Sequence, residues 1–381
     1  MPDKNMKILE LCHYSAGVCG VWSRVREESS RLVKKGYKVT VFSSNHIKSS
    51  DAIAPNKDSL NGIEIKRFKA KKLGGESFMY WNFVKEAVDM QPDIIIAHNY
   101  RQIHTTKALK VARILRKKGK KVKVFLVTHA PFVEGNITRS FIAKIAVKLY
   151  DSLIGRATIN KFDKVITISN WELPYLYNIG LEKNKVEYIP NGIPEQFFTQ
   201  KAAKEKNIIL FFARISPKKK VETLVEAIPY LKNKDIKIEI VGPREKDYFD
   251  KIKHLIKKLR VEKRIIISQP IYYLNKKIEK IDSCKVFVLP SRVEGMPQSL
   301  IEALARGKIV IGSDSIAIRD LIKDGKNGFL FEFDNPRDLA RKIDISLKAK
   351  NQKIKKNAKI FVKQFSWDKI IDKIEKLIRQ S

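Results

Sequence analysis

Cysteine is scarce in this sequence, and long hydrophobic runs are absent from it. Cys12, Cys19 and Cys284 form no CxxC pair, which excludes a disulfide framework and a zinc site built on paired thiolates. No stretch approaches the ~20 apolar residues of a membrane-spanning helix. Residues 7–11 already have the pattern of a strand, which leaves no room for a signal peptide before them. We therefore expect a cytoplasmic protein with reduced thiols.

Acidic residues are few relative to basic ones. Lys and Arg number 77 against 41 Asp and Glu, which gives a formal net charge of +36. Such an excess favours polyanionic partners, which are nucleic acids, anionic membrane surfaces or phosphorylated substrates. The basic residues are spread over many segments, and no RRM, KH or zinc signature accompanies them. The charge alone therefore leaves the kind of partner open.

Strand and helix patterns alternate along the chain in two blocks. Continuous apolar runs such as residues 93–97 and 208–212 are typical of strands buried on both faces of a parallel sheet. Segments with helical spacing, such as residues 105–117 and 247–259, lie between such runs. The pattern predicts the α/β class, with two Rossmann-like doubly wound domains that face each other across a cleft.

A turn-rich segment at residues 189–194 separates the two blocks. We expect an N-terminal domain over residues 1–190 and a C-terminal domain over residues 191–362. Residues 363–381 then form a terminal amphipathic helix. We expect the apolar side of this helix to pack back toward the N-terminal domain.

The densest candidate site lies between residues 288 and 303. A buried strand is followed by a loop containing Gly295, and a helix begins after Pro297, a residue typical of a first helical turn. Backbone N–H groups at such a helix start bind anions. Glu294 on the loop and Glu302 in the helix have the chemistry to hold sugar or ribose hydroxyls. On spacing alone they fit equally a surface loop residue and an ordinary helix carboxylate.

A second, basic cluster follows the predicted strand at residues 208–212. Arg214 comes directly after this strand, and three lysines stand at residues 218–220. Arginine suits bidentate phosphate contacts and lysine acts as a point charge, so together they can neutralise a diphosphate. A solvated basic turn is the alternative that the spacing leaves open.

Taken together, these segments resemble the retaining glycosyltransferases of family 4 (glycosyl transferases group 1), which have the GT-B fold. The family's E-x7-E element matches Glu294 and Glu302, and its R-x4-K element matches Arg214 and Lys219. Shorter signatures match in the same order from about residue 7 to residue 375: G-V at 20–21, K-G-Y-K-V-T-V at 35–41, P-N-G-I at 190–193 and D-G-K-N-G-F-L at 324–330.

The resemblance implies a hexosyltransferase that moves a hexose from a UDP- or GDP-sugar to a glycan or lipid-linked acceptor with retention of the anomeric configuration. It assigns the diphosphate to Arg214 and Lys219, as catalytic residues that stabilise the leaving group. It assigns the donor sugar to Glu294 and the ribose to Glu302. The resemblance assigns five further positions to the donor site: Gly295, Met296, Pro297 and Gln298 beside Glu294, and Gly20 near the start of the chain. No metal or other cofactor is expected, and the chain has no Asp-x-Asp sequence.

By the same resemblance, the N-terminal domain binds the acceptor. His129 follows a predicted buried strand where the family commonly has T-x-H, which places it at the reaction centre. The usual scheme gives the acceptor's proton to the leaving phosphate, so His129 need not be a base. His98 matches only the second His of the family's H-x-H and is a candidate acceptor-site residue. Ser169 and Asn170 match a family position at a strand end.

Three positions depart from the family pattern. The first Gly-Gly is Cys19-Gly20, the usual V-G-x-G-P is contracted to residues 241–243, and the last Gly-Gly is Ile316-Ala317. These departures leave the donor base and the sugar open. They also keep an alternative function: a non-catalytic basic protein that binds nucleic acid or anionic surfaces and carries a degenerate nucleotide-sugar site.

Basic and apolar residues alternate at helical spacing between residues 137 and 159. A basic amphipathic helix of this kind binds anionic lipid, and it would bring the enzyme to a lipid-linked acceptor at the inner face of the membrane. An ordinary helix that faces the protein core fits the spacing equally well. The sequence thus gives peripheral membrane association as a hypothesis, without specific recognition of nucleic acid.

Overall fold

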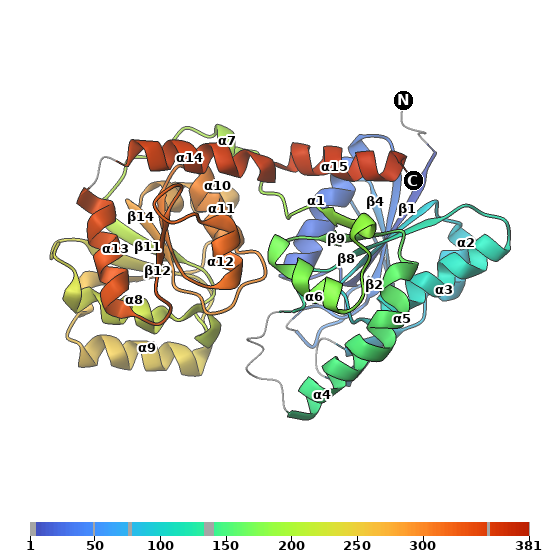
Figure 1. Cartoon of the computed structure of the whole chain (residues 1–381), viewed down its shortest axis with the longest axis horizontal. Coiled ribbons are helices and arrows are strands. Elements are labelled where there is room, and N and C mark those ends of the chain that lie inside the picture. The colour runs from blue at the N-terminus through green and yellow to red at the C-terminus, as the bar shows by residue number, and fades with distance from the viewer. Residues whose placement is uncertain (1–4, 49, 75–77, 133–140, 349–350, 381) are drawn as a thin grey trace. The chain divides into compact units, whose positions relative to one another are not determined.

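The computed structural model describes residues 5–48, 50–74, 78–132, 141–348 and 351–380. These residues form two compact units (Figure 1). Unit 1 contains the described residues up to Gly192 and those from Trp367 onward, and unit 2 contains Ile193–Ser366. Residues 191–192 therefore belong to unit 1 and residues 363–366 to unit 2.

Unit 1 is built on a sheet with the strand order β10-β9-β8-β7-β1-β2-β4-β3. All neighbouring strands are parallel except the antiparallel pair β3 and β4. The chain leaves β1 in one direction along the sheet and later returns to its other side at β7, so the topological switch point lies between these two strands. The strands are β1 (Lys7–Tyr14), β2 (Lys38–Ser44), β3 (Lys57–Leu60), β4 (Ile63–Phe68), β7 (Ile94–His98), β8 (Lys123–Val127), β9 (Lys164–Thr167) and β10 (Val186–Tyr188).

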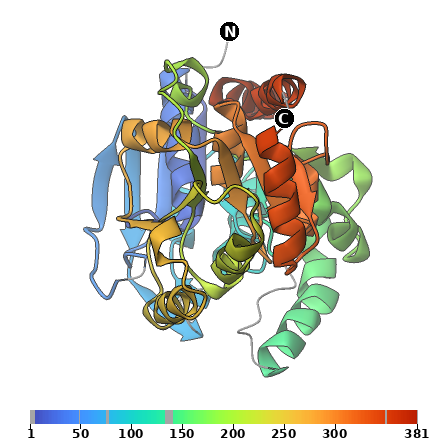
Figure 2. The ribbon, with the colours of Figure 1, turned by 90° about the vertical axis from the view of Figure 1, so that its left-hand side faces the viewer.

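Unit 2 has a six-stranded parallel sheet in the order β13-β12-β11-β14-β15-β16. This is the order of a dinucleotide-binding fold, with its switch point between β11 and β14. Helices lie on both faces of the sheet (Figure 2). The strands are β11 (Ile208–Phe212), β12 (Lys237–Val241), β13 (Ile265–Ser268), β14 (Val286–Leu289), β15 (Ile309–Ser313) and β16 (Phe329–Phe331).

Helices cover both sheets as the alternating sequence pattern predicts. The helices of unit 1 are α1 (Gly20–Lys34), α2 (Val84–Met90), α3 (Ile103–Lys117), α4 (Phe141–Leu149), α5 (Arg156–Thr158), α6 (Leu173–Asn178) and α15 (Trp367–Arg379). Those of unit 2 are α7 (Gln196–Thr199), α8 (Val221–Ala227), α9 (Lys246–Lys258), α10 (Leu274–Asp282), α11 (Gln298–Ala305), α12 (Ile316–Leu321), α13 (Pro336–Lys348) and α14 (Gln352–Val362).

The terminal helix α15 packs on α1 of unit 1, as predicted. Glu375 accepts a hydrogen bond from Lys35 Nζ at 2.8 Å and another from the Tyr37 hydroxyl at 3.2 Å. Trp367 begins the helix and lies against Gly192, where an added Cβ would come within 2.5 Å of the indole ring. The residue at position 192 must therefore be glycine for α15 to pack this closely.

Two parts of unit 1 differ from the expectation. Residues 57–81 carry β3, β4 and the two-stranded sheet of β5 (Ala70–Gly74) and β6 (Phe78–Trp81), which the sequence pattern did not predict. The predicted basic helix at residues 137–159 is described from Phe141 onward as α4, a π-helix at Tyr150–Gly155 and α5; residues 137–140 lie outside the described residues.

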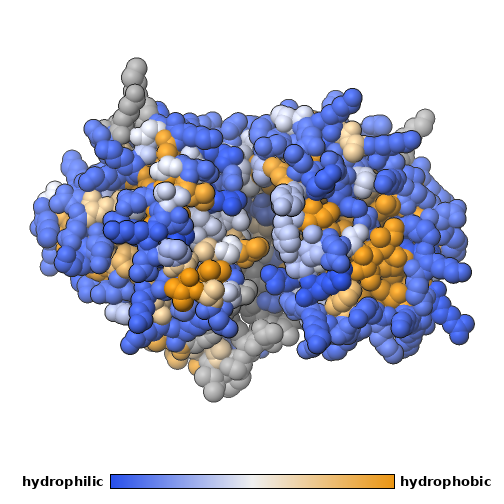
Figure 3. All heavy atoms as spheres, turned by 180° about the vertical axis from the view of Figure 1, so that it is seen from behind, coloured by the Kyte–Doolittle hydropathy of each residue, from blue (hydrophilic) through white to orange (hydrophobic). Residues whose placement is uncertain are grey.

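Hydrophilic side chains cover most of the molecular surface. Figure 3 shows them over the face opposite to that of Figure 1, with separate hydrophobic patches between them. Within the described ranges, no helix combines the length and the apolar composition needed to cross a membrane.

Candidate active site

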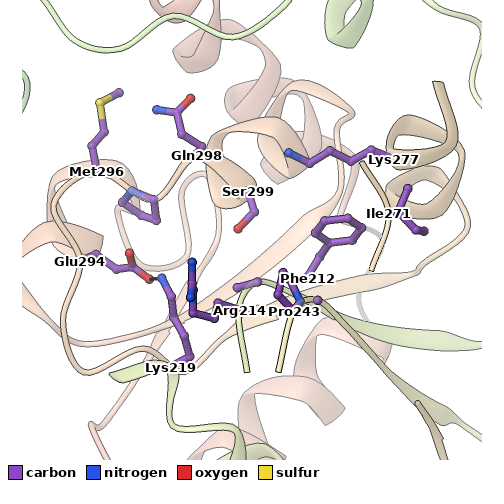
Figure 4. Close-up of a pocket in the computed structure, with 13 residues that line it drawn as sticks. Phe212, Arg214, Lys219, Pro243, Ile271, Lys277, Glu294, Met296, Gln298 and Ser299 are labelled. Carbon is purple, nitrogen blue, oxygen red and sulfur yellow. Dashed lines mark hydrogen bonds and ion pairs between the residues drawn. The ribbon is translucent and has the colours of Figure 1, made fainter. Parts of the chain in front are cut away.

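A pocket of about 360 Å³ lies in unit 2 at the carboxyl ends of its strands, next to the switch point between β11 and β14. Open parallel sheets bind ligands at this position. Figure 4 shows Lys219 and Glu294 pointing toward one another, with Arg214 beside them and Lys277 entering from the other side. The pocket is lined by Phe212, Ala213, Arg214, Lys219, Gly242, Pro243, Ile271, Lys277, Glu294, Met296, Pro297, Gln298 and Ser299.

Two cations reach the pocket from the segment that follows β11. Arg214 is exposed to solvent, and no ion-pair partner of its guanidinium is found in the described parts of the chain. Lys219 ends a short 3-10 turn at Pro217–Lys219, and its Nζ lies 2.5 Å from Glu294 Oε1. The hydrogen bond from Arg292 N to the Lys218 carbonyl, at 3.0 Å, joins this turn to the loop after β14. The two loops at the switch point thus hold Lys219 and Glu294 together.

The third cation, Lys277, comes from α10, and sequence reasoning missed it. Its Nζ lies 2.6 Å from the carboxylate of Glu302 on α11. Glu302 is only 5% exposed and does not line the pocket itself. Lys277 therefore connects the buried carboxylate to the pocket surface. No sequence signal distinguishes it, because α10 carries several lysines that resemble a solvated helix face.

The loop before α11 supplies backbone groups to the same pocket. Met296, Pro297 and Gln298 line it, while Gly295 does not. The helix begins at Gln298, so its first N–H groups and the positive end of its dipole lie at the pocket wall. Together with the three cations, this arrangement favours an anionic ligand.

Gly242 forms the wall of the pocket beside β12, in the segment where the family pattern is contracted. A Cβ at this residue would lie 1.9 Å from the carbonyl oxygen of Ala213, and its φ is +150°. Only glycine permits such a close approach between the ends of β11 and β12. The contraction at residues 241–243 therefore leaves the glycine that this wall requires.

The predicted acceptor-site residues lie in unit 1. His98 is the last residue of β7 and is fully buried, and His129 follows β8 and is partly exposed. Nδ1 of His98 lies 2.9 Å from Nε2 of His129. Ser169 begins a capping box with Glu172. Gly20, a predicted donor-site residue, lies in unit 1 and does not line the pocket of unit 2. It starts α1 with open space around its Cβ position, so the structure gives no steric reason for glycine there.

Two families of known proteins match the chain, and together they cover most of it. Glycosyl transferases group 1 matches residues 192–361, and Glycosyltransferase Family 4 matches residues 18–197. The chain belongs to glycosyltransferase family 4. It is therefore a glycosyltransferase enzyme, as the resemblance of its motifs predicts.

Two relatives of this glycosyltransferase match it over part of their length. An uncharacterized glycosyltransferase of Methanocaldococcus jannaschii is 29% identical over 246 residues, which are 62% of this chain and 66% of the relative. The N,N'-diacetylbacillosaminyl-diphospho-undecaprenol alpha-1,3-N-acetylgalactosaminyltransferase of Campylobacter jejuni is 26% identical over 200 residues, or 48% of this chain and 50% of the relative. The matched segments thus span between half and about two thirds of these relatives.

The fold of the glycosyltransferase is GT-B. A crystal structure of Anabaena HepE in complex with UDP and glucose matches it with a TM-score of 0.74 and 17% sequence identity, over 99% of this chain and 100% of HepE. At this identity, the likeness shows the fold and not the substrate.

Proposed function

We propose that the chain is a retaining, metal-independent hexosyltransferase that transfers a hexose from a UDP- or GDP-sugar to a glycan or lipid-linked acceptor. The observation that carries this proposal is the group of three cations, Arg214, Lys219 and Lys277, around one pocket at the switch point of unit 2. HepE was crystallised with UDP and glucose, and the Campylobacter jejuni relative is named for a diphospho-undecaprenol substrate. Both support this choice of donor and acceptor class.

The pocket cations fit the charge that develops during transfer. As the bond between the sugar and the diphosphate breaks, negative charge grows on the leaving diphosphate. Arg214 already lines the pocket, and Lys219 reaches the diphosphate by turning from Glu294, so both stabilise that charge and lower the barrier more than they strengthen ground-state binding. In this scheme the side-chain cations take the role that a metal ion has in other sugar transfers, which is why we propose that none is needed.

The two glutamates bind different parts of the donor. Glu294 accepts hydrogen bonds from the hydroxyls of the donor sugar when Lys219 turns from it to the diphosphate. Glu302 accepts hydrogen bonds from the ribose, and Lys277 orients its carboxylate. The attacking hydroxyl comes from the same face as the leaving phosphate, which takes its proton. The anomeric configuration is retained in such a front-face attack.

Thermal unfolding with a panel of nucleoside diphosphates tests the donor site. A ligand at ~100 times its dissociation constant adds ~2.7 kcal/mol to the free energy of unfolding, which raises the Tm by several degrees. We expect this rise with UDP or with GDP, and a weaker rise in Glu302→Ala. Glu279→Ala is the control, because Glu279 is an exposed carboxylate of α10 that pairs with Lys276. No rise with any nucleotide contradicts the proposal and favours the non-catalytic alternative.

We also propose peripheral association with an anionic membrane, through the segment of α4 and the π-helix. One side of this segment packs on unit 1, where Asp151 Oδ2 lies 2.5 Å from Arg101 Nη2. Another side exposes large apolar residues near Lys144 and Lys148 of the same segment. The exposed apolar residues are Ile145, Leu149, Leu153 and Ile154, at 43%, 54%, 66% and 45%. This combination of apolar and basic side chains is typical of a helix that lies in a lipid interface.

Cosedimentation with vesicles tests the membrane contact. We expect the protein to bind anionic vesicles at low salt and to bind uncharged ones weakly. The double variant Leu149→Ser/Leu153→Ser should bind anionic vesicles at least several-fold less. Ile360→Ser, which changes a 57% exposed residue of α14, should bind like the unchanged protein. Equal binding by all three proteins would assign the association to general charge, and no binding at all would exclude it.

A further inference from the structure

Three side chains of unit 1 form a hydrogen-bonded chain across the switch point of its sheet. Glu10 of β1 places Oε2 2.6 Å from His98 Nε2, and His98 places Nδ1 2.9 Å from His129 Nε2. Glu10 and His98 are 0% exposed, whereas His129 is partly exposed. Nδ1 of His129 has no hydrogen-bond partner among the described residues. This hydrogen-bonded chain of side chains therefore has one buried end, at Glu10, and one end that is available to a ligand, at His129.

The backbone at the ligand end is held in an unusual conformation. His129 and Ala130 have φ angles of 57° and 52°, which are left-handed values that are uncommon for residues other than glycine. Glu172 holds this turn, because its Oε2 accepts hydrogen bonds from Thr128 Oγ1 at 2.5 Å and from Ala130 N at 2.9 Å. Its Oε1 accepts two further bonds, from the backbone N–H groups of Ile168 and Ser169. The imidazole of His129 is thus fixed from the backbone as well as through His98.

Each of the two hydrogen bonds, Glu10–His98 and His98–His129, contains one proton. These protons therefore have two consistent arrangements. When Glu10 is ionised, it accepts the proton of His98 Nε2, His98 Nδ1 accepts that of His129 Nε2, and His129 Nδ1 carries a lone pair. When Glu10 is protonated, it donates to His98 Nε2, His98 Nδ1 donates to His129 Nε2, and His129 Nδ1 carries a proton. Both imidazoles are neutral in either arrangement.

We propose that Glu10 and His98 are positioning residues that set the tautomer of His129, so that the charge of Glu10 decides whether His129 Nδ1 accepts or donates a hydrogen bond to a sugar bound at unit 1. This assignment of a ligand rests on the proposed glycosyl transfer. The control of the tautomer by Glu10 does not, because it follows from contacts within unit 1.

The groups around Glu10 set the pH at which the arrangement changes. From α1, Arg24 and Glu28 face it, with Arg24 Nε 3.1 Å from Glu28 Oε2. The Ser29 hydroxyl of the same helix favours the charged form of Glu10, and Cys12 is its neighbour on β1. From α3, His104 Nε2 contacts the His98 carbonyl at 2.8 Å, and His104 Nδ1 lies 3.2 Å from His13 Nδ1.

Two carboxyl groups therefore share the single guanidinium of Arg24. Burial raises the pKa of Glu10 to about 8 and that of Glu28 to about 7, and it lowers the pKa of His98 to about 3, which keeps this imidazole neutral. Below about pH 8, Glu10 is protonated and His129 Nδ1 is a donor. Above it, Glu10 is ionised and His129 Nδ1 is an acceptor.

Nitrogen NMR of the protein labelled with 15N-histidine reads the tautomer directly, and the chain has only 6 histidines to assign. In the unchanged protein we expect the proton of His129 to move from Nδ1 to Nε2 as the pH rises through about 8. Glu10→Gln should abolish this exchange. Glu28→Gln should move its midpoint to lower pH, because Arg24 is then left to Glu10 alone. His104→Gln is the control for loss of a buried polar group and should keep the exchange.

The same variants distinguish this inference from the proposed function. In transfer assays, kcat/KM of the unchanged protein should show an inflection near pH 8 that Glu10→Gln lacks and His104→Gln retains. A His129 tautomer that does not change with pH overturns the inference, even if transfer is observed. A tautomer that follows Glu10 while no sugar nucleotide is turned over upholds the positioning role and contradicts the proposed function. The titration of the unchanged protein decides the matter should Glu10→Gln fail to fold.

Discussion

Replacement of Arg214 by alanine is expected to lower kcat for sugar transfer by about 10²–10³-fold. The guanidinium lines the pocket from the end of β11, where, in the proposed function, it faces the charge that develops on the leaving diphosphate. Arg214 is exposed and lacks an ion-pair partner in the described parts of the chain, so no ion pair of the fold is lost with it. The free energy of unfolding should therefore change by less than ~0.5 kcal/mol.

The matched control for this prediction is Arg341→Ala. Arg341 is an exposed arginine of unit 2 that pairs with Asp338 within one turn of α13, so its removal should change neither kcat nor stability appreciably. Initial rates at saturating donor, together with thermal unfolding of each variant, give both quantities. Full activity of Arg214→Ala would show that this cation does not act on the leaving group.

Replacement of Asp282 by alanine should lower the free energy of unfolding by about 3–5 kcal/mol. Asp282 ends α10 and receives two hydrogen bonds of 2.8 Å from the guanidinium of Arg306, which follows α11. The side chains are 1% and 4% exposed. Removal of the carboxylate leaves the buried cation without its counter-charge, and the cost of that desolvation is large.

This buried pair also supports the candidate active site. The pair joins the C-terminal ends of two helices. One is α10, the helix of Lys277, and the other is α11, the helix of Glu302. We therefore expect Asp282→Ala to weaken nucleoside diphosphate binding as well as stability. Denaturant unfolding measures the first effect, with Glu279→Ala as a control on the same helix that should lose less than ~1 kcal/mol. A loss of that small size in Asp282→Ala would show that the pair is not important for the fold.

The sequence predicted those site residues that lie close to one another in the sequence. Glu294 and the start of α11 lie within one strand–loop–helix unit, and Arg214 and Lys219 lie within another, so the alternating pattern alone indicated that these residues stand at the carboxyl ends of strands. The switch point of unit 2 then brings the two loops together. The residues that were predictable are those whose position depends on the order of elements.

The sequence did not predict the roles of Lys277 and Glu10, because their partners are distant in the sequence. The partner of Lys277 is 25 residues away on another helix, and only the helical phase of α10 against α11 selects it over Lys276 and Lys280. Glu10 meets His98 across 88 residues, because β7 crosses over to pair with β1. Packing of distant elements determines both contacts, and no local pattern encodes it.

The secondary structure also has elements that the sequence predicts and elements that it does not predict. Buried parallel strands such as β11 and β14 begin and end where the apolar runs do, because every residue of these runs is buried. In residues 57–81, β3 (KDSL) and β5 (AKKLG) are mostly polar, and β4 (IEIKRF) alternates apolar with polar residues, so none of these three strands has the continuous apolar run that predicts a buried strand. The π-helix at Tyr150–Gly155 likewise has the composition of an ordinary helix.

Calorimetric titration of a nucleoside, its monophosphate and its diphosphate into the unchanged protein and Arg214→Ala tests most directly whether the pocket of unit 2 binds a nucleotide sugar through its diphosphate. We expect the diphosphate of one base to bind at least tenfold more tightly than the monophosphate, and we expect Arg214→Ala to remove most of this difference. Equal affinity for all three ligands, or an unchanged difference in Arg214→Ala, would contradict the role that we assign to the pocket cations.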